Sequence, residues 1–351
     1  MLGLQARGHA GLLLAPAGPL LERARAEGLA VERWSPLGEW DALAMLRAAG
    51  MLRRFEPGVV HCHSAHAHAV GVPAARLADV PVAVVSRRVD FAVAGNPLSR
   101  LKYHLPVDRY LCVSRGVIEV MLRAGIPAGR LALVPDGVDV PPPDAASGVG
   151  GPVVPATDLR ALLGLAPGTQ VVGTVAALAP HKDHANLMRA AAIVVAERPD
   201  VHFVWVGEGE CRNALERQRV ALGLERRVHL LGFRADAPGL LAQFTVFALS
   251  SYLEGLCTSL LDAQVLGVPV VATAVGGVPD VVADGVTGRL VPGRDSAALA
   301  RALLEALARP EEGRRLAARA RDSVRRFSVD AMVARTLEEY VAALRERTGR
   351  G

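Results

Sequence analysis

The amino-acid sequence predicts an α/β fold of two doubly wound, Rossmann-like domains that face a cleft. Three observations lead to this fold class. Apolar residues make up 51% of the 351 positions, enough for two cores of ordinary size. Short runs of Val, Leu and Ala alternate with helical patterns, as in a parallel sheet covered by helices on both faces. A stretch rich in Pro, Gly and Ala, residues 138–158, interrupts this alternation, which then restarts.

The first half of the chain supplies one domain. Strands are expected at the apolar runs 11–15, 29–32, 59–63, 82–86, 109–114 and 131–135. Helices are expected between them, at 19–28, 41–55, 69–79 and 117–125. Ser114 is predicted to cap the last of these helices, with a ligand contact as the alternative. Residues 1–18 could also be a signal peptide, but the regular alternation that follows favours a strand.

The second half repeats the pattern. Strands are expected at 171–178, 201–207, 228–233, 244–250 and 268–273. Helices are expected at 184–197, at 210–222, twice within 295–326, and at 329–345. We therefore predict an N-terminal domain at 1–145, a linker at 146–168, a C-terminal domain at 169–327, and a last helix within 328–351 that packs back on the N-terminal domain.

Composition narrows the possible functions. The four cysteines form no C-x-x-C pair, which is typical of a protein of the reducing cytoplasm. No apolar run is long enough to span a membrane. Aromatic residues make up only 4% of the chain, which argues against nucleic acid as a partner. One arginine-rich segment is either a solvated helix face or a surface attracted to anionic lipid headgroups: Arg314, Arg315, Arg319, Arg321, Arg325 and Arg326.

The stretch EGLCTSLLD carries two acids eight positions apart, Glu254 and Asp262. A helix that begins near Thr258, with Thr258 as N-cap, would leave Glu254 in the preceding loop and Asp262 one turn into the helix. Free backbone N–H groups at a positive helix end lie between them, and such groups bind phosphate. The stretch therefore predicts a site for an anion with hydroxyl groups on either side, as in a nucleotide sugar.

Loops with similar chemistry follow the other expected strands of the second half. Lys182, in TVAALAPHKDH, can neutralise a phosphate. Gly207 and Gly209 in VGEGE would let a ligand approach the backbone closely. Gly232 and Arg234 belong to a third loop, and a Gly-Gly pair at 276–277 to another. Because parallel strands end at one edge of a sheet, these loops are expected to meet there.

The sequence resembles the GT-B glycosyltransferases, and within them the large retaining group numbered family 4. The most specific part is EGLCTSLLDAQVLGVPVVATAVGGVPDVVADGVTGRLVP, which is similar to the family's E-x7-E segment and its trailing Gly-Gly loop. VPDGVD, residues 134–139, resembles the turn that closes the family's first domain. The resemblance covers almost the whole chain.

The resemblance implies a role for each matching residue. Glu254 would contact hydroxyls of the donor sugar, and Asp262 the ribose diol. Lys182 and the N–H groups of the four residues that follow Glu254 would hold the diphosphate, and three residues near the end of another strand would border the base. No metal or other cofactor is implied, and the sugar keeps its anomeric configuration. The diphosphate contacts are Gly255, Leu256, Cys257 and Thr258, and the base contacts are Gly232, Phe233 and Arg234.

The chain departs from the family pattern at three places. Asp262 stands where Glu is usual, which shortens the reach. Ala177 stands where an Arg usually helps to hold the phosphate, and Arg234 or Arg88 could replace that charge. The first strand of the N-terminal domain has no counterpart in LGLQARGHA, and its absence is expected to leave two neighbouring strands with unpaired backbone groups.

The first half offers candidate residues for the acceptor side. His61, His63, His66 and His68 could bind a metal, but no Cys or acidic ligand accompanies them, so an acceptor contact by His63 or His66, or a structural role, is favoured. After the next strand, Arg87 and Arg88 could bind an anionic substrate or form surface ion pairs. Asp90 could orient an acceptor hydroxyl. We expect His63, His66, Arg88 and Asp90 on the acceptor side.

The predicted function is a cytoplasmic glycosyltransferase. It would move a sugar from a nucleotide diphosphate sugar to a lipid-linked or saccharide acceptor in the synthesis of cell envelope, lipopolysaccharide or surface polysaccharide, with contact to the inner membrane face. A sugar-nucleotide 2-epimerase of the same fold is one alternative. A non-catalytic remnant that binds nucleotide sugar is the other.

Overall fold

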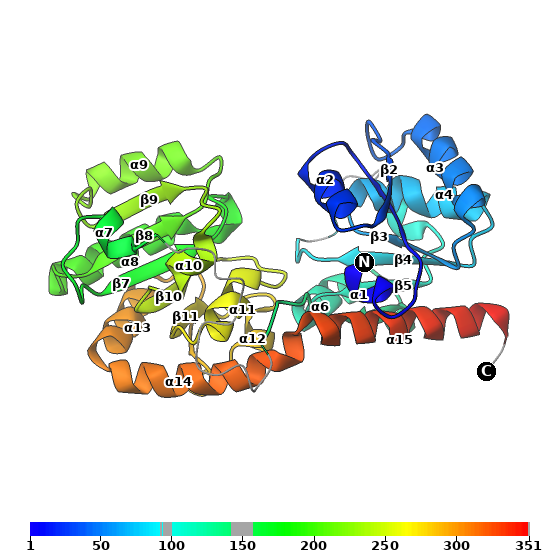
Figure 1. Cartoon of the computed structure of the whole chain (residues 1–351). Coiled ribbons are helices and arrows are strands. Elements are labelled where there is room, and N and C mark those ends of the chain that lie inside the picture. The colour runs from blue at the N-terminus through cyan, green and yellow to red at the C-terminus, as the bar shows by residue number, and fades with distance from the viewer. Residues whose placement is uncertain (92, 94–99, 142–156, 350–351) are drawn as a thin grey trace. The chain divides into compact units, whose positions relative to one another are not determined.

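A computed structural model describes residues 1–91, 93, 100–141 and 157–349 of the chain. The chain forms two compact units. The first contains Met1–Pro135 and Val329–Gly351, and the second contains Asp136–Ser328. Each unit holds parallel strands and helices (Figure 1), so the predicted α/β class is confirmed.

The strands of the first unit form two parallel sheets instead of one. β1 (Leu12–Ala15) pairs with β2 (Ala30–Arg33). The other sheet has the order β3-β4-β5-β6, and its strands are Val59–Cys62, Val82–Arg87, Arg109–Cys112 and Leu131–Leu133. Among the described residues, β1 and β3 each pair along one edge only.

The open edges of β1 and β3 correspond to the expected unpaired backbone groups. The first four residues of β4 are buried, whereas most residues of β1 and β3 are only partly buried. Water that reaches partly exposed strands can hydrate N–H and C=O groups that no strand pairs, and this lowers the cost of an open edge.

The helices of the first unit follow local capping signals. The Asp41 carboxylate accepts a hydrogen bond from the Ala44 N–H at the start of α3, and the Ser114 hydroxyl accepts one from the Val117 N–H at the start of α6, as predicted for Ser114. The α-helices of this unit are α1 (Leu2–Gln5), α2 (Pro19–Ala26), α3 (Ala42–Phe55), α4 (Val72–Leu77), α6 (Arg115–Arg123) and α15 (Val329–Thr348). Short π or 3-10 turns cover Ala67–Gly71, Lys102–His104 and Ala128–Arg130.

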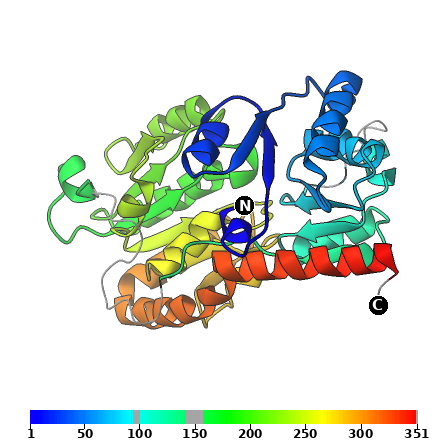
Figure 2. The same ribbon diagram turned by 45° about the vertical axis from the view of Figure 1, so that its right-hand side comes forward.

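The last helix, α15, belongs to the first unit. Ala343 is buried in a cluster with apolar residues of β4, β5 and β6, and Tyr340 and Leu344 pack against the same cluster. The Arg347 side chain also donates to the Asp108 carboxylate at 2.8 Å. α1 contacts α15 as well, and the two helices lie side by side in both ribbon views (Figures 1 and 2).

The second unit contains a six-stranded parallel sheet with the order β12-β11-β10-β7-β8-β9. The chain therefore starts at a central strand and builds outward in both directions, and the order reverses between β7 and β10. Ligands of such sheets bind outside the carboxyl ends of the strands at this switch point. The strands are β7 (Val171–Val175), β8 (His202–Val206), β9 (Val228–Gly232), β10 (Val246–Leu249), β11 (Val270–Thr273) and β12 (Arg289–Val291).

Helices cover the sheet of the second unit around a core that includes Phe203, Trp205 and Leu187. α8 (His184–Glu197) has the predicted bounds, and α9 (Arg212–Ala221) lies within the predicted 210–222. Residues 146–156 of the predicted linker lie outside the described residues, and α7 (Leu159–Leu162) falls within the rest of the linker. The other helices are α10 (Ala237–Leu241), α11 (Thr258–Val265), α12 (Val278–Val281), α13 (Ser296–Ala308) and α14 (Pro310–Ser323), with 3-10 turns at Pro180–Lys182 and Val324–Phe327.

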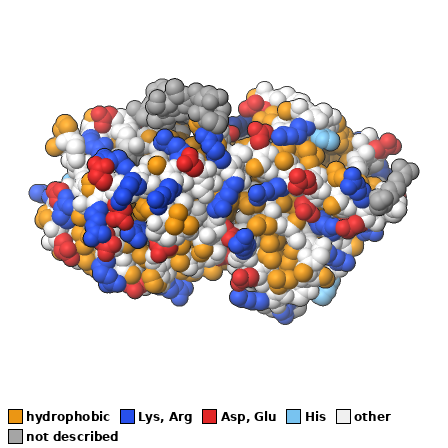
Figure 3. Space-filling model, turned by 90° about the horizontal axis from the view of Figure 1, so that it is seen from below, with side chains coloured by type: hydrophobic (Ala, Val, Ile, Leu, Met, Phe, Trp, Pro, Cys, Tyr) orange, Lys and Arg blue, Asp and Glu red, His pale blue; other side chains and the backbone are white. Residues whose placement is uncertain are grey.

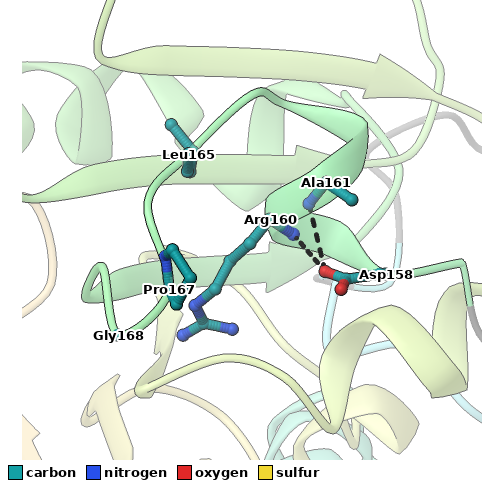
Figure 4. Close-up of a pocket in the computed structure, with 6 residues that line it drawn as sticks. All are labelled: Asp158, Arg160, Ala161, Leu165, Pro167 and Gly168. Carbon is teal, nitrogen blue, oxygen red and sulfur yellow. Dashed lines mark hydrogen bonds between the residues drawn. The ribbon is translucent and has the colours of Figure 1, made fainter.

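An open cavity of about 430 Å³ lies beside α7 (Figure 4). Asp158, which caps α7, and Arg160 line it. The Arg160 side chain donates to the carbonyl of Thr169, just before β7 begins, so the cavity lies at the amino-terminal edge of the sheet. The switch point opens at the opposite edge, and this cavity is therefore separate from the predicted site.

Candidate active site

Two loops that flank the switch point bring Lys182 and Glu254 together. Lys182 follows β7 and Glu254 follows β10, 72 residues later. The Lys182 Nζ lies 2.6 Å from Oε2 of Glu254, and both side chains are largely buried. The Ser251 hydroxyl donates to the same carboxylate oxygen at 3.0 Å. Sequence reasoning missed Ser251, because two serines before a loop carry no signal of a carboxylate partner.

Hydrogen bonds hold these loops in a fixed arrangement. The Ser250 hydroxyl donates to the Lys182 carbonyl, and the Tyr252 N–H donates to the His181 carbonyl, both at 2.9 Å. The Gly277 N–H, in the loop after β11, donates to the Glu254 carbonyl at 2.9 Å. The loops after β7, β10 and β11 are therefore tied together through their backbones, which fixes the position of Glu254.

The helix α11 begins at Thr258, as predicted, but Thr258 is not its N-cap. Cys257 occupies that position, and no side chain caps the helix. Within the part of the chain that the structure describes, the N–H groups of 255–259 donate to no backbone carbonyl, although Gly255, Leu256 and Cys257 are buried. Buried donors at a helix N-terminus form a positive site that can bind an anion.

Asp262 lies one turn into α11 and is partly buried. Burial raises the pKa of the Asp262 carboxyl, and the negative charge of Asp139 adds a smaller effect, so that the pKa is about 6. The Asp262 carboxyl is therefore ionised in most molecules at neutral pH, and the carboxylate can then accept hydrogen bonds from two hydroxyls. The influence of Asp139 was not predicted, since it lies in a different part of the chain.

Other backbone atoms of the chain approach Gly207 and Gly209 closely. A Cβ atom at Gly207 would lie 2.0 Å from the Ala176 carbonyl oxygen, and one at Gly209 would lie 2.5 Å from the Leu178 carbonyl oxygen. Gly207 also has a φ of 148°. The loop after β7, which carries Ala177, therefore already requires glycine at both positions, and the close approach of a ligand to them stays a prediction.

The residues expected near the base follow β9. Phe233 is 79% exposed, whereas Gly232 is buried with a φ of 73°. The Arg234 guanidinium donates to both carboxylate oxygens of Asp236, at 2.8 and 2.7 Å, and to the Thr157 hydroxyl at 2.9 Å. Arg234 is therefore paired with Asp236 and bonded to Thr157, and its compensation for the charge missing at Ala177 stays a prediction.

The histidines of the first unit separate into different environments. The His61 ring nitrogens lie 2.6 Å from the Tyr340 hydroxyl and 2.8 Å from the Ser86 hydroxyl, so both are engaged. His63 has its ring centroid 4.0 Å from that of His61. His68 is buried beside Tyr103 and Tyr110, and His66 is exposed. Tyr340 was missed because it lies 279 residues from His61.

The charged residues after β4 lie near this histidine pair. Burial, then the charges of His63 and Arg88, lower the pKa of His61 well below its ordinary value. Arg88 is therefore close to His61 at the carboxyl ends of β3 and β4. Asp90 is buried. Among the described residues, no group of three His, Cys, Asp or Glu side chains has the arrangement of a metal site.

The predicted arginine-rich segment lies on α14 and the turn after it. Arg314 forms an ion pair with Glu311, Arg326 donates to the Asp280 carbonyl at 2.9 Å, and Arg325 donates to the Pro141 carbonyl at 3.1 Å. On the face shown in Figure 3, basic side chains of the second unit are interspersed with acidic ones. No helix in the described part of the chain combines the length and apolar character needed to cross a bilayer.

Comparison with protein families places two models on the chain. The model described as "Glycosyl transferases group 1" matches residues 156–323, which include Lys182, Glu254 and Asp262. The model described as "Glycosyltransferase Family 4" matches residues 1–141.

Similar proteins of known name are transferases. A 2-deoxystreptamine N-acetyl-D-glucosaminyltransferase of Streptomyces fradiae is 30% identical over 89% of this chain and 77% of its own length. A UDP-Gal:alpha-D-GlcNAc-diphosphoundecaprenol alpha-1,3-galactosyltransferase of Escherichia coli is 28% identical over 68% of this chain. The match spans 63% of the galactosyltransferase and 40% of a D-inositol 3-phosphate glycosyltransferase of Salinispora tropica.

Solved structures share the fold. Anabaena Alr3699/HepE in complex with UDP and glucose superimposes with a TM-score of 0.78 at 23% identity, over 93% of this chain and 91% of that one. A glycosyltransferase from Rickettsia africae superimposes with a TM-score of 0.83 at 17% identity, over 99% of this chain and 93% of that one. The chain is therefore a glycosyltransferase of the GT-B fold and belongs to glycosyl transferases group 1, family 4.

Proposed function

We propose that this glycosyltransferase moves a sugar from a nucleotide diphosphate sugar to an acceptor hydroxyl with retention of the anomeric configuration. The observation that carries the proposal is the set of N–H groups at the start of α11 that donate to no backbone carbonyl among the described residues, beside the Lys182–Glu254 pair. A diphosphate satisfies these donors, and its charge is matched by the helix end and by Lys182. Alr3699/HepE, of the same fold, binds UDP, which supports a nucleotide ligand.

The donor would extend from this anion site in two directions. Toward the sugar, the Glu254 carboxylate accepts hydrogen bonds from sugar hydroxyls once Lys182 turns to the phosphate. Toward the nucleoside, Asp262 accepts from the ribose diol. The exposed Phe233 ring, with Gly232 and Arg234, borders the base and offers it an apolar surface.

In the transfer step, the bond between the anomeric carbon and the phosphate oxygen breaks, and a bond from that carbon to the acceptor oxygen forms on the same face. The acceptor proton passes to the departing diphosphate. Negative charge therefore grows on the phosphate as the bond breaks. The α11 N–H groups and Lys182 stabilise this charge more strongly in the transition state than in the ground state, and preorganised donors of this kind lower the barrier.

The acceptor is assigned to the first unit, at the carboxyl ends of β3 and β4. His63, His66, Arg88 and Asp90 are the candidate contacts, and a basic Arg88 favours an acceptor that carries phosphate. The name of the E. coli relative specifies a diphosphate-linked lipid acceptor, which supports a lipid-linked acceptor in the synthesis of cell envelope or surface polysaccharide. We place the enzyme in the cytoplasm, in peripheral contact with the inner face of the membrane.

Binding without turnover is the second candidate. Ala177 leaves one phosphate charge without its usual partner, and Arg234 is engaged by Asp236. A protein with this site could hold a nucleotide sugar and fail to transfer it. An epimerase of the same fold would change the sugar without releasing nucleoside diphosphate.

One experiment separates these functions. The purified protein is titrated with UDP, GDP and ADP sugars by calorimetry, and the best ligand is then incubated with lipid-linked and free saccharide acceptors. A transferase yields glycosylated acceptor and an equal amount of nucleoside diphosphate. Binding with neither product would contradict the proposed transfer, and an altered sugar still attached to nucleotide would identify an epimerase.

A further inference from the structure

Large apolar side chains are exposed around the start of α3, and the proposed active site does not use them. Leu37 is 97% exposed, Leu43 is 68% exposed and Leu46 is 58% exposed, and Trp40 is 44% exposed. We refer to these four residues as the α3 apolar face. Single exposed leucines are ordinary on a protein surface, but these four lie within ten positions, two in the loop before α3 and two in its first turns.

α3 is apolar on two opposite sides. Its inner side buries Ala44, Ala48, Ala49 and Leu52 in a core cluster. At 3.6 residues per turn, Leu43 and Leu46 lie roughly 60° apart on the outer side. Figures 1 and 2 both show α3 at the outside of the first unit.

Basic residues flank the exposed leucines. Arg47, Arg53 and Arg54 are exposed, and α3 contains no Asp or Glu. Arg53 donates to the Leu77 carbonyl, and Arg54 lies 3.3 Å from Glu32. An outer helix face with leucines in the middle and arginines at its margins is typical of helices that lie in a membrane interface.

The loop before α3 holds its apolar side chains in place. The Asp41 carboxylate accepts from the Leu37 N–H and from the Ala44 N–H, both at 2.9 Å. Glu39 forms an ion pair with the buried Lys102. Leu37 and Trp40 are therefore presented by a braced turn, and a partner that contacts them does not have to order the loop.

α14, which has more arginines, lacks the apolar part. None of the large exposed apolar residues of the described chain lies on α14. Its arginines share the helix with Glu311, Glu312 and Asp322, and Arg314 pairs with Glu311. The combination of exposed Leu and Trp with Arg occurs on α3.

We propose that the α3 apolar face docks the protein on an anionic lipid membrane. The leucines and Trp40 enter the boundary between headgroups and acyl chains, and the arginines attract lipid phosphates. A second copy of the chain is a poorer occupant. Arg54 already pairs with Glu32, but a two-fold contact would bring Arg47 and Arg53 of both copies to one interface, and α3 itself carries no acid to neutralise them.

Docking through this face has a consequence for the acceptor, and this consequence rests on the proposed function. Glu39 follows the carboxyl end of β2, and its partner Lys102 follows that of β4. The docked face therefore adjoins the edge that carries Arg88 and Asp90. A lipid-linked acceptor could reach these residues with its headgroup while its chain stays in the bilayer.

Co-sedimentation of the full chain with vesicles tests the proposal. The vesicles contain equal parts of phosphatidylglycerol and phosphatidylcholine. We expect the wild type to bind and Leu43→Ser/Leu46→Ser to lower the partition coefficient by about tenfold for each leucine withdrawn from lipid. Val220→Ser/Leu222→Ser, at exposed apolar positions of the second unit, is the matched control and should bind like the wild type.

Tryptophan emission reports the same contact directly. Trp34 and Trp205 are buried, so only Trp40 can enter lipid without unfolding. Vesicles should shift the emission to the blue, and Trp40→Phe should abolish that shift. Titration with UDP is run on every variant, because nucleotide binding reports the proposed catalytic function separately from docking.

Four results would overturn the docking proposal. They are an absence of vesicle binding, equal loss in the Val220→Ser/Leu222→Ser control, loss only in Arg315→Ser/Arg319→Ser on α14, and a dimer in sedimentation velocity that Leu43→Ser/Leu46→Ser dissociates. If UDP fails to bind but vesicles do, the proposed function fails and the docking surface stands.

Discussion

Lys182 and Glu254 show how single residues define the candidate site. Both charges are largely buried and lie 2.6 Å apart, so each neutralises the other. In the proposed function, a donor phosphate would compete for the Lys182 ammonium, and the sugar hydroxyls would compensate the Glu254 carboxylate.

Removing either charge should affect stability as well as turnover. Lys182→Met or Glu254→Gln leaves a buried group without its partner, and we expect each to lower the free energy of unfolding by about 3 kcal/mol. Turnover should fall by a factor of about 10² to 10³. Urea denaturation and initial rates measure the two effects. The double variant should be more stable than the sum of the single losses predicts, and simple additivity would contradict a direct pair.

Asp262 should make the stability of the protein depend on pH. Its folded pKa, about 6, lies above the reference value of 3.8, so burial of the ionised form opposes folding above pH 6, and this opposition disappears as pH falls toward 4. We expect Asp262→Asn to raise the free energy of unfolding by about 1–3 kcal/mol at pH 8, and by little at pH 4.

The same carboxyl should control nucleotide affinity. The wild type should bind UDP more weakly as pH falls through 6, because a protonated Asp262 loses an acceptor for the ribose hydroxyls. Calorimetric titration between pH 5 and 8 measures this. Asp139→Asn removes one cause of the raised pKa and should move the profile to lower pH. If UDP binding by Asp262→Asn depends on pH in the same way as binding by the wild type, this assignment is wrong.

At the scale of elements, the loops after β7 and β8 pack closely against each other, and this packing requires a glycine. The Leu178 N–H donates to the Glu208 carbonyl and the Ala176 N–H to the Val206 carbonyl, so the two loops extend the pairing of their strands. Gly207 is needed where the Ala176 carbonyl crosses it. This contact positions the loop that leads to Lys182.

Gly207→Ala should therefore disrupt the loop that carries Lys182. The added methyl group would meet the Ala176 carbonyl at 2.0 Å, and we expect a loss of at least about 3 kcal/mol in the free energy of unfolding, with weaker UDP binding. Gly223→Ala is the control. Gly223 has a φ of 66° but open space around it, so only backbone strain of about 1 kcal/mol is expected. Equal losses in both variants would argue against the loop contact.

At the scale of the whole molecule, each unit has its own core. Among the described residues, one buried apolar cluster lies in the second unit, and others lie in the first, one of which includes Ala343 of α15. The first unit also divides its strands between two sheets with open edges at β1 and β3. Fewer of its strands pair along both edges, so we expect the first unit to be the less stable one.

Calorimetry should resolve two unfolding transitions. A UDP concentration about 100 times the dissociation constant should stabilise the second unit by about 2.7 kcal/mol and raise only the upper transition. Tyr340→Ala removes the hydroxyl bonded to His61 and part of the packing of α15, and should lower only the first transition. A single transition that both changes move together would show that the units unfold as one.

The sequence by itself determined the class of fold and the local elements. The bounds of α8, the start of α11 at Thr258 and the cap at Ser114 were predictable, because apolar periodicity and capping depend on residues within a few positions of one another. The alternation of strands and helices also predicted that the loops after the strands would meet at one edge.

Only the tertiary structure decided which side chains meet. Four contacts join residues that are distant in sequence. They are the Lys182–Glu254 pair, the effect of Asp139 on Asp262, the bond between His61 and Tyr340, and the close contact of Gly207 with the loop of Ala177. Local patterns do not encode these contacts, since they depend on strand order and on the packing of whole elements. The exposed outer side of α3 follows the same rule, because burial is a property of what surrounds a helix and not of its own sequence.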